Sequence, residues 1–325
     1  MSEILLSIIV PVYNVEPYLK DCLDSFFTQD IPSREYEVVC VDDGSSDRSG
    51  EILDSYAAVH ENMKVIHQNN SGVSVARNKG LDSSSGKYVW FVDSDDMIAA
   101  DCLSAIKTVL TETDCDQLII LPIEFNDGEP VNCRTGFSVE HVSDRVKSYL
   151  ITRILKKSVI DKSGVRFNPD ICCQEDNVFY TELYPFISEK AVLDDRISYY
   201  YRVRANSLSR GGVPSERILS SLISGAIEMK KQHELHGDSY NGYIFNLYRF
   251  VTMITGDVTY MPVDKRKEYI AELKNNGLFP LKYSKVYTVK NYNNNLSLGS
   301  KMRRRIRNLS YTRTGFVLAC FINRL

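Results

Sequence analysis

The stretch Val89-Trp90-Phe91-Val92-Asp93-Ser94-Asp95-Asp96 carries the strongest structural signal in this chain of 325 residues. Its first four residues are β-branched or aromatic, which predicts a buried strand, and three carboxylates follow within the next four. In open α/β sheets, ligands bind at the carboxyl ends of the strands. Carboxylates this close repel one another unless a cation lies between them, and their hard oxygens suit Mg²⁺ or Mn²⁺. The alternative is a helix cap, in which Ser94 or Asp95 begins a helix with apolar residues between 103 and 110.

Apolar runs alternate with amphipathic segments around this stretch. The apolar run at 5–12 and the buried run at 38–41, typical of strands buried on both faces, predict two strands. Residues 64–66 predict a short third strand and residues 87–92 a fourth. Apolar residues at helical spacing predict helices between them, with Asn14 as the cap of the first and residues 73–81 within the third. This alternation predicts an α/β fold, with a mostly parallel sheet and right-handed connections through flanking helices.

The second half of the chain has a different pattern. It predicts a strand at 118–121 that Pro122 ends, a helix at 142–155, a helix through Val178 and Leu183, and a strand at 197–202. From about residue 214 to 276, the spacing of apolar residues is helical throughout. We therefore predict an α/β domain at 1–211, a helical region at 212–290 and a basic amphipathic tail at 291–325.

The tail carries a marked charge asymmetry. The formal net charge of the chain is −3, yet no Asp or Glu follows Glu272, whereas eleven Lys and Arg residues do. Residues 299–322 can form a basic amphipathic helix, and each basic residue near an anionic leaflet contributes about 1 kcal/mol of binding. The tail is therefore expected to bind an anionic membrane surface, with a solvated tail or a helix packed on the α/β domain as alternatives. No nucleic-acid partner is expected, because neither stacking aromatics nor a nucleic-acid-binding fold accompanies these charges.

The cysteines and the N-terminus indicate the compartment. The eight cysteines form no C-x-x-C pair and several lie in apolar runs, which favours reduced thiols in a cytosolic protein. The N-terminus lacks the pattern of a signal peptide, and no stretch reaches the ~20 apolar residues that span a bilayer. We expect a cytoplasmic protein that lies peripherally on the inner face of the cell membrane.

Several short motifs together resemble a known family. They are Val10-Pro11-Val12-Tyr13-Asn14, Val41-Asp42-Asp43-Gly44-Ser45-Ser46-Asp47, residues 70–80, Asp93-Ser94-Asp95-Asp96, Glu175-Asp176 and residues 199–209. In this order, over roughly residues 5–210, they resemble the large inverting glycosyltransferase family numbered 2, which has the GT-A fold. The resemblance implies a Rossmann-like GT-A catalytic domain at 1–211 and a glycosyltransferase activity of the hexosyltransferase type.

The resemblance also implies a nucleotide site at the ends of the first two strands. Pro11 and Tyr13 match positions that pack against the base. Asp43 matches the carboxylate that accepts the uracil N3–H, a pairing that favours UDP over a purine nucleotide. The role of Asp42 stays open. The alternative for both aspartates is a simple acidic turn, with Asp47 capping the helix that follows.

Three further residues are implied to contact the donor. Arg77, in the first turns of a helix that faces the ligand edge, is expected to hold the base or a phosphate with two hydrogen bonds. Arg202 and Ser207 are expected on a mobile loop that closes over the diphosphate and excludes water. The alternatives are a surface Arg77 paired with Asp82 or Glu51, and an ordinary basic loop.

The acidic motifs are implied to supply the metal ligand and the catalytic base. Asp95 is the expected ligand of Mn²⁺ or Mg²⁺, with Asp93 contacting the metal or the ribose, and the cation would neutralise the departing diphosphate. Asp176 is the expected general base, with Glu175 beside it in the catalytic pair. The alternative is a helix N-terminus, where acids complement the helix dipole. Gln174 stands where many members of the family have Gly or another small residue, so the sequence departs from the family pattern at this position.

The predicted function is metal-dependent transfer of a sugar, with inversion, from a UDP-sugar to a glycan or polyprenyl-diphosphate-linked saccharide in surface polysaccharide synthesis. A nucleotidyltransferase would have a Gly-rich phosphate loop where Pro11-Val12-Tyr13-Asn14 stands. A hydrolase is suggested by Gly72-Val73-Ser74-Val75-Ala76, which lacks the last glycine of G-x-S-x-G. The remaining alternative is a non-catalytic sugar-nucleotide-binding or membrane scaffold protein that kept the fold.

Overall fold

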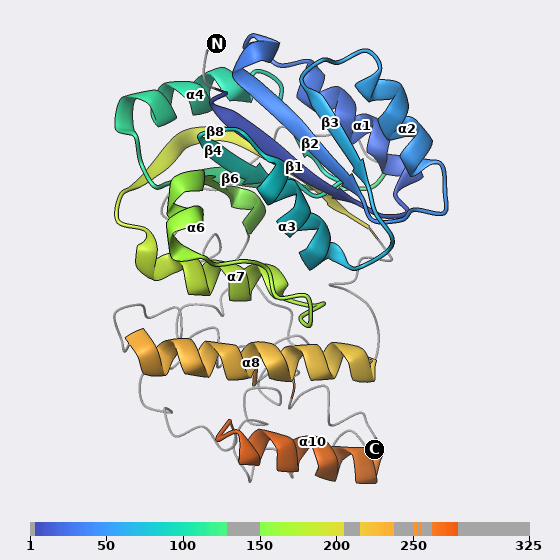
Figure 1. Cartoon of the computed structure of the whole chain (residues 1–325), viewed down its shortest axis with the longest axis vertical. Coiled ribbons are helices and arrows are strands. Elements are labelled where there is room, and N and C mark those ends of the chain that lie inside the picture. The colour runs from blue at the N-terminus through green and yellow to red at the C-terminus, as the bar shows by residue number, and fades with distance from the viewer. Residues whose placement is uncertain are drawn as a thin grey trace. The chain divides into compact units, whose positions relative to one another are not determined.

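The computed structural model of this chain describes residues 4–128, 150–204, 215–236, 250–251, 254 and 262–278. The residues group into two compact units, which we call the first and the second unit (Figure 1). The first unit comprises Met1–Pro169 and Glu175–Arg210, and the second comprises Asp170–Gln174 and Gly211–Leu325. The short segment Asp170–Gln174 therefore belongs with the later part of the chain.

Strands and helices alternate along most of the first unit. Its strands are β1 (Leu6–Val12), β2 (Tyr36–Asp42), β3 (Met63–His67), β4 (Tyr88–Phe91), β5 (Met97–Ile98), β6 (Gln117–Asn126), β7 (Arg153–Lys156) and β8 (Lys190–Val203). Its helices are α1 (Glu16–Phe27), α2 (Ser49–Ala57), α3 (Val73–Ser83), α4 (Cys102–Thr113), α6 (Lys157–Ser163) and α7 (Glu175–Leu183). The strands and helices that the apolar pattern predicts up to residue 110 are confirmed.

The described strands form one eight-stranded sheet in the order β3-β2-β1-β4-β7-β6-β8-β5. β1 lies parallel between β2 and β4, and β2 pairs in parallel with β3. β7 is antiparallel to both β4 and β6, and β5 is antiparallel to β8. The predicted α/β fold with a mostly parallel sheet is confirmed. Because β1, β2 and β4 are parallel, the motifs that follow them meet at one edge of the sheet.

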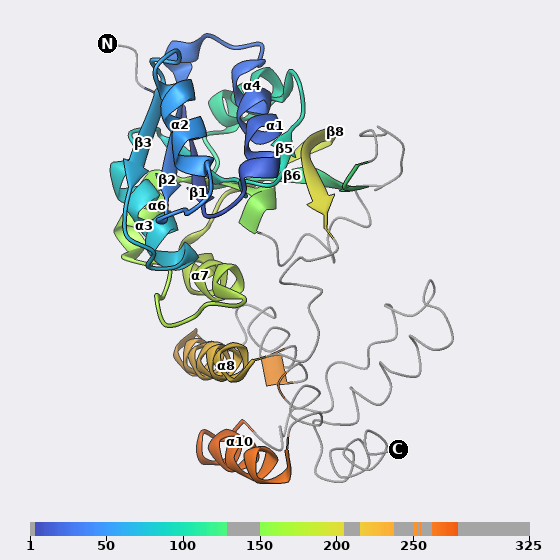
Figure 2. The ribbon, with the colours of Figure 1, turned by 90° about the vertical axis from the view of Figure 1, so that its right-hand side faces the viewer.

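Helices cover both faces of this sheet (Figure 2). Successive residues of a strand point to opposite faces. Ile8 and Trp90 therefore join α1, α2 and α4 in one core cluster, whereas Ile9 and Phe91 join α3, α6 and α7 in the other. All four side chains are fully buried. Burial on both faces explains why the central strands are continuous apolar runs rather than alternating ones.

Helix α3 approaches the sheet closely. A Cβ atom at Gly80 would collide with Cγ2 of Ile9 in β1 and would lie 3.5 Å from Cγ2 of Val41 in β2. Only glycine leaves this space free, so Gly80 sets the depth at which α3 packs on the strands. The helix carries Arg77 on the preceding turn.

Strand β6 is longer than the sequence predicts. We expected Pro122 to end it, but the strand continues to Asn126, with Pro122 paired to Tyr199 of β8. The register of this pairing shifts between Leu121 and Pro122. Because β7 covers β6 only at Gln117–Ile119, the missing N–H of Pro122 costs no ladder bond on that side.

The helix predicted at 142–155 is wrong for its described part. Residues 142–149 lie outside the described residues, Leu150–Thr152 form a single 3-10 turn, and Arg153–Lys156 form β7. Ile154 packs into one core cluster and Leu155 into the other, as neighbouring strand residues do. A short apolar run fits either period, and the pairing of β7 with β4 and β6 decides for the strand.

Two predicted helix caps are also corrected. Helix α1 begins at Glu16 with Val15 as its N-cap, and Asn14 instead accepts hydrogen bonds from the backbone of Ser46 (2.8 Å) and Asp47 (3.4 Å). The helix that Ser94 or Asp95 would begin starts later, at Cys102, because β5 intervenes. The cap reading of the acidic stretch is therefore wrong.

Beyond residue 214, the described part of the second unit is mainly helical. It contains α8 (Glu216–His236) and α10 (Val263–Asn275), and α8 is bordered by the fully buried Phe250, against which Gly225 packs. The predicted helical pattern from 214 to 276 is confirmed at these positions, while Phe245, Leu247, Tyr248 and the tail at 291–325 lie outside the described residues. None of the helices among the described residues has the length and hydropathy needed to cross a membrane.

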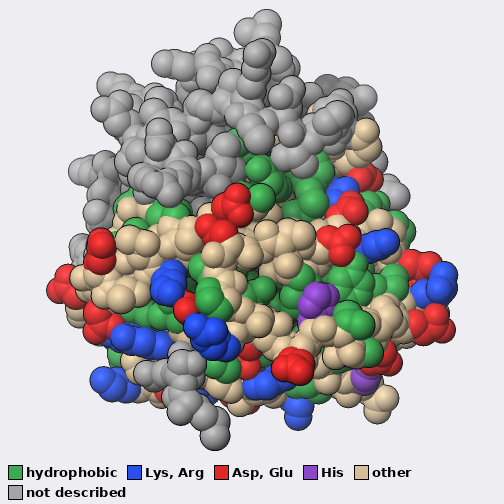
Figure 3. All heavy atoms as spheres, turned by 90° about the horizontal axis from the view of Figure 1, so that it is seen from above, with side chains coloured by type: hydrophobic (Ala, Val, Ile, Leu, Met, Phe, Trp, Pro, Cys, Tyr) green, Lys and Arg blue, Asp and Glu red, His purple; other side chains and the backbone are tan. Residues whose placement is uncertain are grey.

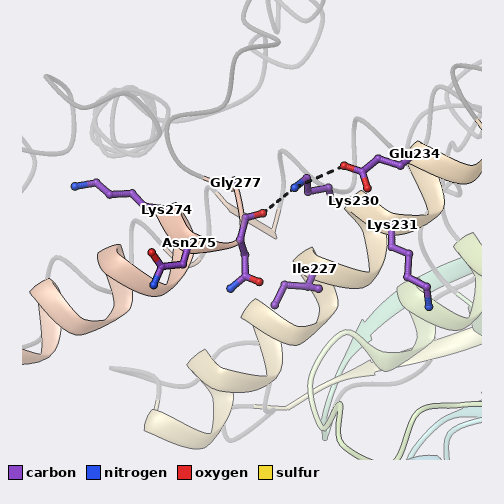
Figure 4. A pocket seen from close by; sticks show the side chains of 8 residues that line it. Ile227, Lys230, Lys231, Glu234, Lys274, Asn275 and Gly277 are labelled. Atoms are coloured by element: carbon purple, nitrogen blue, oxygen red, sulfur yellow. Dashed lines mark hydrogen bonds and ion pairs between the residues drawn. The ribbon is translucent and has the colours of Figure 1, made fainter.

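A polar hollow of about 410 Å³ lies between α8 and the end of α10 (Figure 4). Lys230 donates to the carbonyl of Asn276 (2.9 Å) and lies 3.6 Å from Glu234, while Lys231 lies 3.3 Å from Glu228. Two of its lysines are therefore already paired with acceptors of the second unit. The hollow contains none of the residues that the sequence motifs single out.

Charged side chains of both signs are interspersed on the face that Figure 3 shows, with hydrophobic side chains between them. This agrees with the composition of the chain, in which 39 Lys and Arg residues accompany 42 Asp and Glu residues. The described part of that face therefore carries no extended patch of one sign.

Candidate functional site

The three carboxylates that follow β4 have different partners. Oδ1 of Asp93 accepts from Nη2 of Arg77 (2.9 Å), and Oδ2 of Asp95 accepts from Nη2 of Arg204 (2.5 Å). Asp96 accepts from the hydroxyl of Tyr199 (2.6 Å) and from the backbone N–H of residue 202 (2.7 Å). Asp93 is therefore held by α3, whereas Asp95 and Asp96 are held by β8 and the residue that follows it.

The three carboxylates also differ in how exposed they are to solvent. Asp96 is only 1% exposed, whereas the side chains of Asp95 and Asp93 are 18% and 34% exposed. Burial, followed by the charges of Asp95 and Asp93, raises the pKa of Asp96 well above its ordinary value. Burial and the charge of Asp93 also raise the pKa of Asp95, which Arg204 opposes. Asp96 is thus a structural carboxyl that ties this turn to β8, and Asp93 and Asp95 remain open to a ligand.

The donor set fits Mg²⁺ or Mn²⁺ bound largely through other molecules. The ion pairs use one oxygen each of Asp93 and Asp95, and the other oxygen of each lies outside these pairs. Among the described residues, no group of three or more His, Cys, Asp or Glu side chains is placed to hold a metal ion. Mg²⁺ commonly uses one or two carboxylates and takes its remaining ligands from water and substrate phosphates.

Asp43 organises the turn that leads into α3. Its Oδ1 accepts from Nε2 of Gln68 and from the N–H of Ser71, and its Oδ2 accepts from the N–H of Gly72, all at 2.8 Å. Two carboxylate oxygens offer about four acceptor positions, so one remains on Oδ2. The backbone N–H of Asp43 donates to Val12 (2.8 Å), which precedes the half-exposed Tyr13.

Asp42, whose role the sequence leaves open, is part of the same edge. Its Oδ1 accepts from the N–H of Ser45 (3.0 Å), and its Oδ2 lies 2.9 Å from Nδ1 of His67. Nε2 of the same ring lies 3.0 Å from Asp54. Hydrogen bonding to Asp42, then to Asp54, raises the pKa of His67. Asp42 therefore acts as a structural carboxylate in the turn after β2.

Asp47 also has a structural role, as the alternative reading of this motif predicts. Its Oδ1 accepts from the N–H of Ser49 at the start of α2 (3.0 Å). Its Oδ2 accepts from the N–H of Glu16 at the start of α1 (3.0 Å). One carboxylate thus accepts one backbone N–H from the first turn of each of two helices.

Arg77 lies in the centre of the acidic motifs. Its side chain is 7% exposed, with Nη1 2.6 Å from Oε1 of Glu175 and Nη2 2.9 Å from Oδ1 of Asp93. Its Nε is buried without a hydrogen-bond partner in the described part of the chain. Burial lowers the pKa of Arg77, but the charges of Asp93 and Glu175 raise it to a net value above the ordinary one. The alternative of a surface arginine paired with Asp82 or Glu51 is wrong.

The pair Glu175-Asp176 forms the first turn of α7, at the end that faces Arg77. Asp176 accepts from the side-chain amide of Asn177 (3.1 Å), and its charge also contributes to the raised pKa of Arg77. Gln174, just before the helix, has a left-handed φ of 62°. Glycine adopts this conformation without strain, whereas any residue with a Cβ, including Gln174, does not.

Arg202 does not lie on a loop. It belongs to β8 and is buried, with Nε donating to the carbonyl of Asp95 (2.8 Å) and its two amino groups 3.1 Å from Asp127 and Asp21. Its expected place on a mobile loop is therefore wrong, because the pairing of β8 with β6 extends through Val203. Ser207 and Ser209 lie outside the described residues.

The sequence reading missed several partners of these residues. Arg204 binds Asp95, and the ring of Tyr18 lies 5.1 Å from the guanidinium carbon of Arg202 and 5.0 Å from that of Arg204. Asp21 and Asp127 complete the ion pairs of Arg202. Spacing could not reveal these contacts, since Asp21 and Arg202 are 181 positions apart.

Comparison with known proteins gives one family. The family described as Glycosyl transferase family 2 matches residues 7–166. Glycosyltransferase GlyA from Streptococcus pneumoniae is 34% identical over 239 residues, which are 69% of this chain and 34% of GlyA. The chain therefore spans about a third of the length of that relative.

Solved structures extend this likeness. Staphylococcus aureus TarS, a poly(ribitol-phosphate) beta-N-acetylglucosaminyltransferase, is 32% identical over 200 residues, or 60% of this chain and 35% of TarS. TarS 1–349 in complex with UDP superposes with a TM-score of 0.65 at 26% identity, covering 84% of this chain and 80% of that one. TarS 1–349 is also solved with UDP-GlcNAc, at a TM-score of 0.60 and 25% identity over 85% of this chain and 90% of that one.

A more distant structure shares the fold alone. Mannosyltransferase PcManGT from Pyrobaculum calidifontis, in complex with GDP-Man and Mn²⁺, has a TM-score of 0.53 at 16% identity. The match covers 100% of this chain and 88% of that one.

Proposed function

Since this chain belongs to glycosyl transferase family 2 and has a GT-A-like fold, we propose that it transfers a sugar, with inversion, from a UDP-sugar to a saccharide acceptor. One observation carries the proposal. Asp93, at the end of β4, and Glu175, beside Asp176, meet on Arg77 although 98 positions separate Arg77 from Glu175. The fold thus places two acidic motifs next to each other at the ligand edge of the sheet.

The proposed donor nucleotide is UDP. Pro11 is the penultimate residue of β1, and Tyr13 follows the strand directly. The backbone of the neighbouring Asp43 donates to Val12, and its Oδ2 has an acceptor position left for the uracil N3–H. The turn that Asp43 holds is already formed by three hydrogen bonds, so the carboxylate is fixed before a nucleotide binds. TarS, the relative solved with UDP and UDP-GlcNAc, supports this choice of nucleotide.

Asp95 and Asp93 are the proposed ligands of Mg²⁺ or Mn²⁺. When bound, the ion would neutralise the negative charge that develops on the diphosphate as the sugar leaves. Arg202 has three donors engaged, so we propose that it supports the diphosphate side of the site mainly through its charge and its hold on the Asp95 carbonyl. Ser207 is the proposed hydroxyl contact of the diphosphate.

Asp176 is the proposed general base. An inverting displacement needs a carboxylate on the face of the sugar opposite the leaving group, where it takes the proton of the attacking hydroxyl. Asp176 lies in the first turn of α7, where the helix dipole favours the ionised carboxylate that a base needs. Glu175, whose carboxylate binds Arg77, is not free for the same task.

The proposed acceptor is a glycan or a lipid-linked saccharide of surface polysaccharide synthesis, and the catalytic domain is proposed to span 1–211. TarS, whose name gives poly(ribitol-phosphate) as its acceptor, supports a bacterial polymer as the acceptor class. The proposed regions that follow are the helical region at 212–290 and the tail at 291–325. The basic tail would hold the enzyme peripherally on the anionic cytoplasmic face of the membrane, without a nucleic-acid partner.

Calorimetric binding of UDP, with and without Mn²⁺, tests this function on the wild type, on Asp95→Ala and on Asp82→Ala. Asp82 is an exposed carboxylate at the end of α3 and serves as the matched control. We expect Mn²⁺ to strengthen UDP binding in the wild type and in Asp82→Ala, and this dependence to disappear in Asp95→Ala. A wild type that binds no UDP in either condition would overturn the proposal. One that binds UDP but transfers no sugar would favour the scaffold alternative.

A further inference from the structure

Arg77 joins two segments that carry different parts of the proposed reaction. Asp93, which contacts Nη2, belongs to the turn after β4 that carries the proposed metal ligands. Glu175, which contacts Nη1, begins the helix that carries the proposed base. Both ion pairs lie within 3 Å, and the guanidinium is almost fully buried. Buried, doubly paired arginines are poorly replaced by lysine, because an ammonium cannot reach two diverging carboxylates from one position.

A second set of contacts ties α3 to α7. Asn78, the residue after Arg77, exchanges two hydrogen bonds with the backbone of Phe167, at 2.8 Å and 2.9 Å. The ring of Phe167 stacks on Phe179 of α7, with centroids 4.0 Å apart and planes inclined by 3°. Arg77 itself lies over this ring, 5.5 Å from its centroid. The position of α7 relative to α3 is therefore fixed by an ion pair, Arg77 with Glu175, and by the aromatic stack of Phe167 on Phe179.

Helix α3 is in turn fixed to the sheet. Asp43 binds the N–H of Gly72 at its start, and Gly80 lets it pack directly against β1 and β2. These contacts continue from the sheet through α3 to Arg77, and from there to both acidic motifs. A displacement of Arg77 would leave Asp93 and Glu175 uncompensated, and like charges this close repel each other.

We propose that Arg77 is a positioning residue that sets the distance between the metal-binding aspartates and Asp176, and that Glu175 acts through Arg77 rather than on the acceptor. This inference rests on the proposed function, because it assigns these residues to the same reaction. It replaces the expectation that Arg77 binds the nucleotide with two hydrogen bonds. Each terminal amino group already donates to a carboxylate, and the buried Nε has no hydrogen-bond partner among the described residues.

A double-mutant cycle tests this assignment. The variants are Arg77→Lys, Glu175→Gln and the double variant, with Arg166→Lys as a control on a partly exposed arginine that pairs with Asp82. We expect a loss in kcat of about 10- to 100-fold in each single variant, the size of effect produced by a small misplacement of reacting groups. The Kd for UDP should change by less than about threefold, and the double variant should be no slower than the worse single variant.

Two outcomes would overturn the inference. A large increase in the UDP Kd of Arg77→Lys, with kcat retained, would make Arg77 a nucleotide contact. Losses in kcat that multiply in the double variant would show that Glu175 acts independently of Arg77.

The coupling between Arg77 and Glu175 can be tested separately from the reaction. If the wild type transfers no sugar, the proposed function fails, and the same cycle is read from the free energy of urea unfolding. Non-additive losses of stability would still show the coupling between Arg77 and Glu175, and additive losses would exclude it. Glu175→Gln, which keeps an oxygen that can accept from Arg77, remains available if Arg77→Lys does not fold.

Discussion

Asp42 and Asp43 are adjacent in the sequence and contribute differently to the fold. Asp42 closes its own turn and binds His67, whereas Asp43 reaches across to the turn that starts α3. Asp93, Asp95 and Asp96 differ in the same way, each with its own partner. At the scale of the residue, function in this chain depends on which donors each carboxylate meets.

His67 gives this edge a pH dependence. Its ring lies between Asp42 and Asp54, and its pKa is raised, so the protonated ring stabilises the fold below about pH 6.5, the ordinary value for histidine. This contribution is lost as the pH rises through the raised pKa. We expect His67→Gln to lower the free energy of unfolding at about pH 5.5 by roughly 0.5 kcal/mol, since half-exposed ion pairs are screened, and by much less at about pH 9.

Urea unfolding at the two pH values measures this difference. His60→Gln is the control, because the His60 ring stacks on Phe27 with centroids 3.7 Å apart rather than lying between two carboxylates. The change in stability of His67→Gln between the two pH values is compared with that of His60→Gln. Equal losses in His67→Gln at low and high pH would contradict the prediction.

Asp176→Asn tests the base at the same scale. The amide keeps the shape of the side chain but cannot take a proton, so transfer should fall by about 100-fold or more, as expected for the loss of general base catalysis. Binding of UDP should be unchanged, because Asp176 lies in α7 and not at the ends of β1 and β2. Transfer rates and UDP calorimetry on the same preparation check both points. A variant that retains near-normal transfer would remove Asp176 from the role of base.

At the scale of the element, α3 determines the geometry of the candidate site. The residue that precedes it, Gly72, donates to Asp43, and Gly80 packs against the sheet. Arg77 on this helix forms ion pairs with both acidic motifs. Ala76 and Leu81 are the fully buried apolar side chains of this helix, so its position depends on close packing more than on the amount of apolar surface that it buries. A small change in its distance from the sheet would move Arg77 directly.

Gly80→Ala tests this packing. Alanine favours the interior of an exposed helix by up to about 1 kcal/mol over glycine. Here the new methyl group would collide with Ile9, so we expect a net destabilisation of about 1 to 3 kcal/mol, as in overpacked cores. Thermal unfolding provides the measurement. Lys79→Ala, at the exposed neighbouring position, should change stability by less than about 0.5 kcal/mol. A stabilised Gly80→Ala would show that α3 does not require this close approach.

At the scale of the whole molecule, charge is distributed unevenly along the chain. Eleven positive and no negative side chains follow Glu272, although the chain as a whole carries −3. The face in Figure 3 instead mixes the two signs. The sequence therefore confines the excess of positive charge to its last part, which is where an anionic surface would be bound.

Removal of residues 300–325 should weaken binding to vesicles that contain anionic lipid, because each basic residue contributes about 1 kcal/mol near such a surface. Sedimentation with the vesicles measures the bound fraction. Substitution of Arg303, Arg304, Arg305 and Arg307 by glutamine is the matched variant, since it keeps the length of the tail. Binding that is unchanged in both variants would end the membrane proposal.

Most of the sheet and the helices before residue 110 were predictable, because hydrophobic periodicity is a local property. The same argument failed at 150–156, where a short apolar run fits both a helix and a strand, and only its neighbours β4 and β6 resolve the choice. It also failed at Pro122, because the ladder that a proline would break is absent on one side of β6. Pairing with distant strands decided both cases.

The sequence by itself determined which chemical groups stand at the strand ends. Asp43 and the acidic stretch at 93–96 directly follow buried strands, and parallel strands bring their carboxyl ends to one edge. Only the tertiary structure decided what these groups bind: Arg77 with Asp93 and Glu175, Arg204 with Asp95, and Tyr199 with Asp96. The physical reason is the separation along the sequence over which each kind of interaction acts. The pattern that forms a strand or helix is set by neighbours within a few residues, whereas ion pairs between buried side chains depend on how separate segments pack.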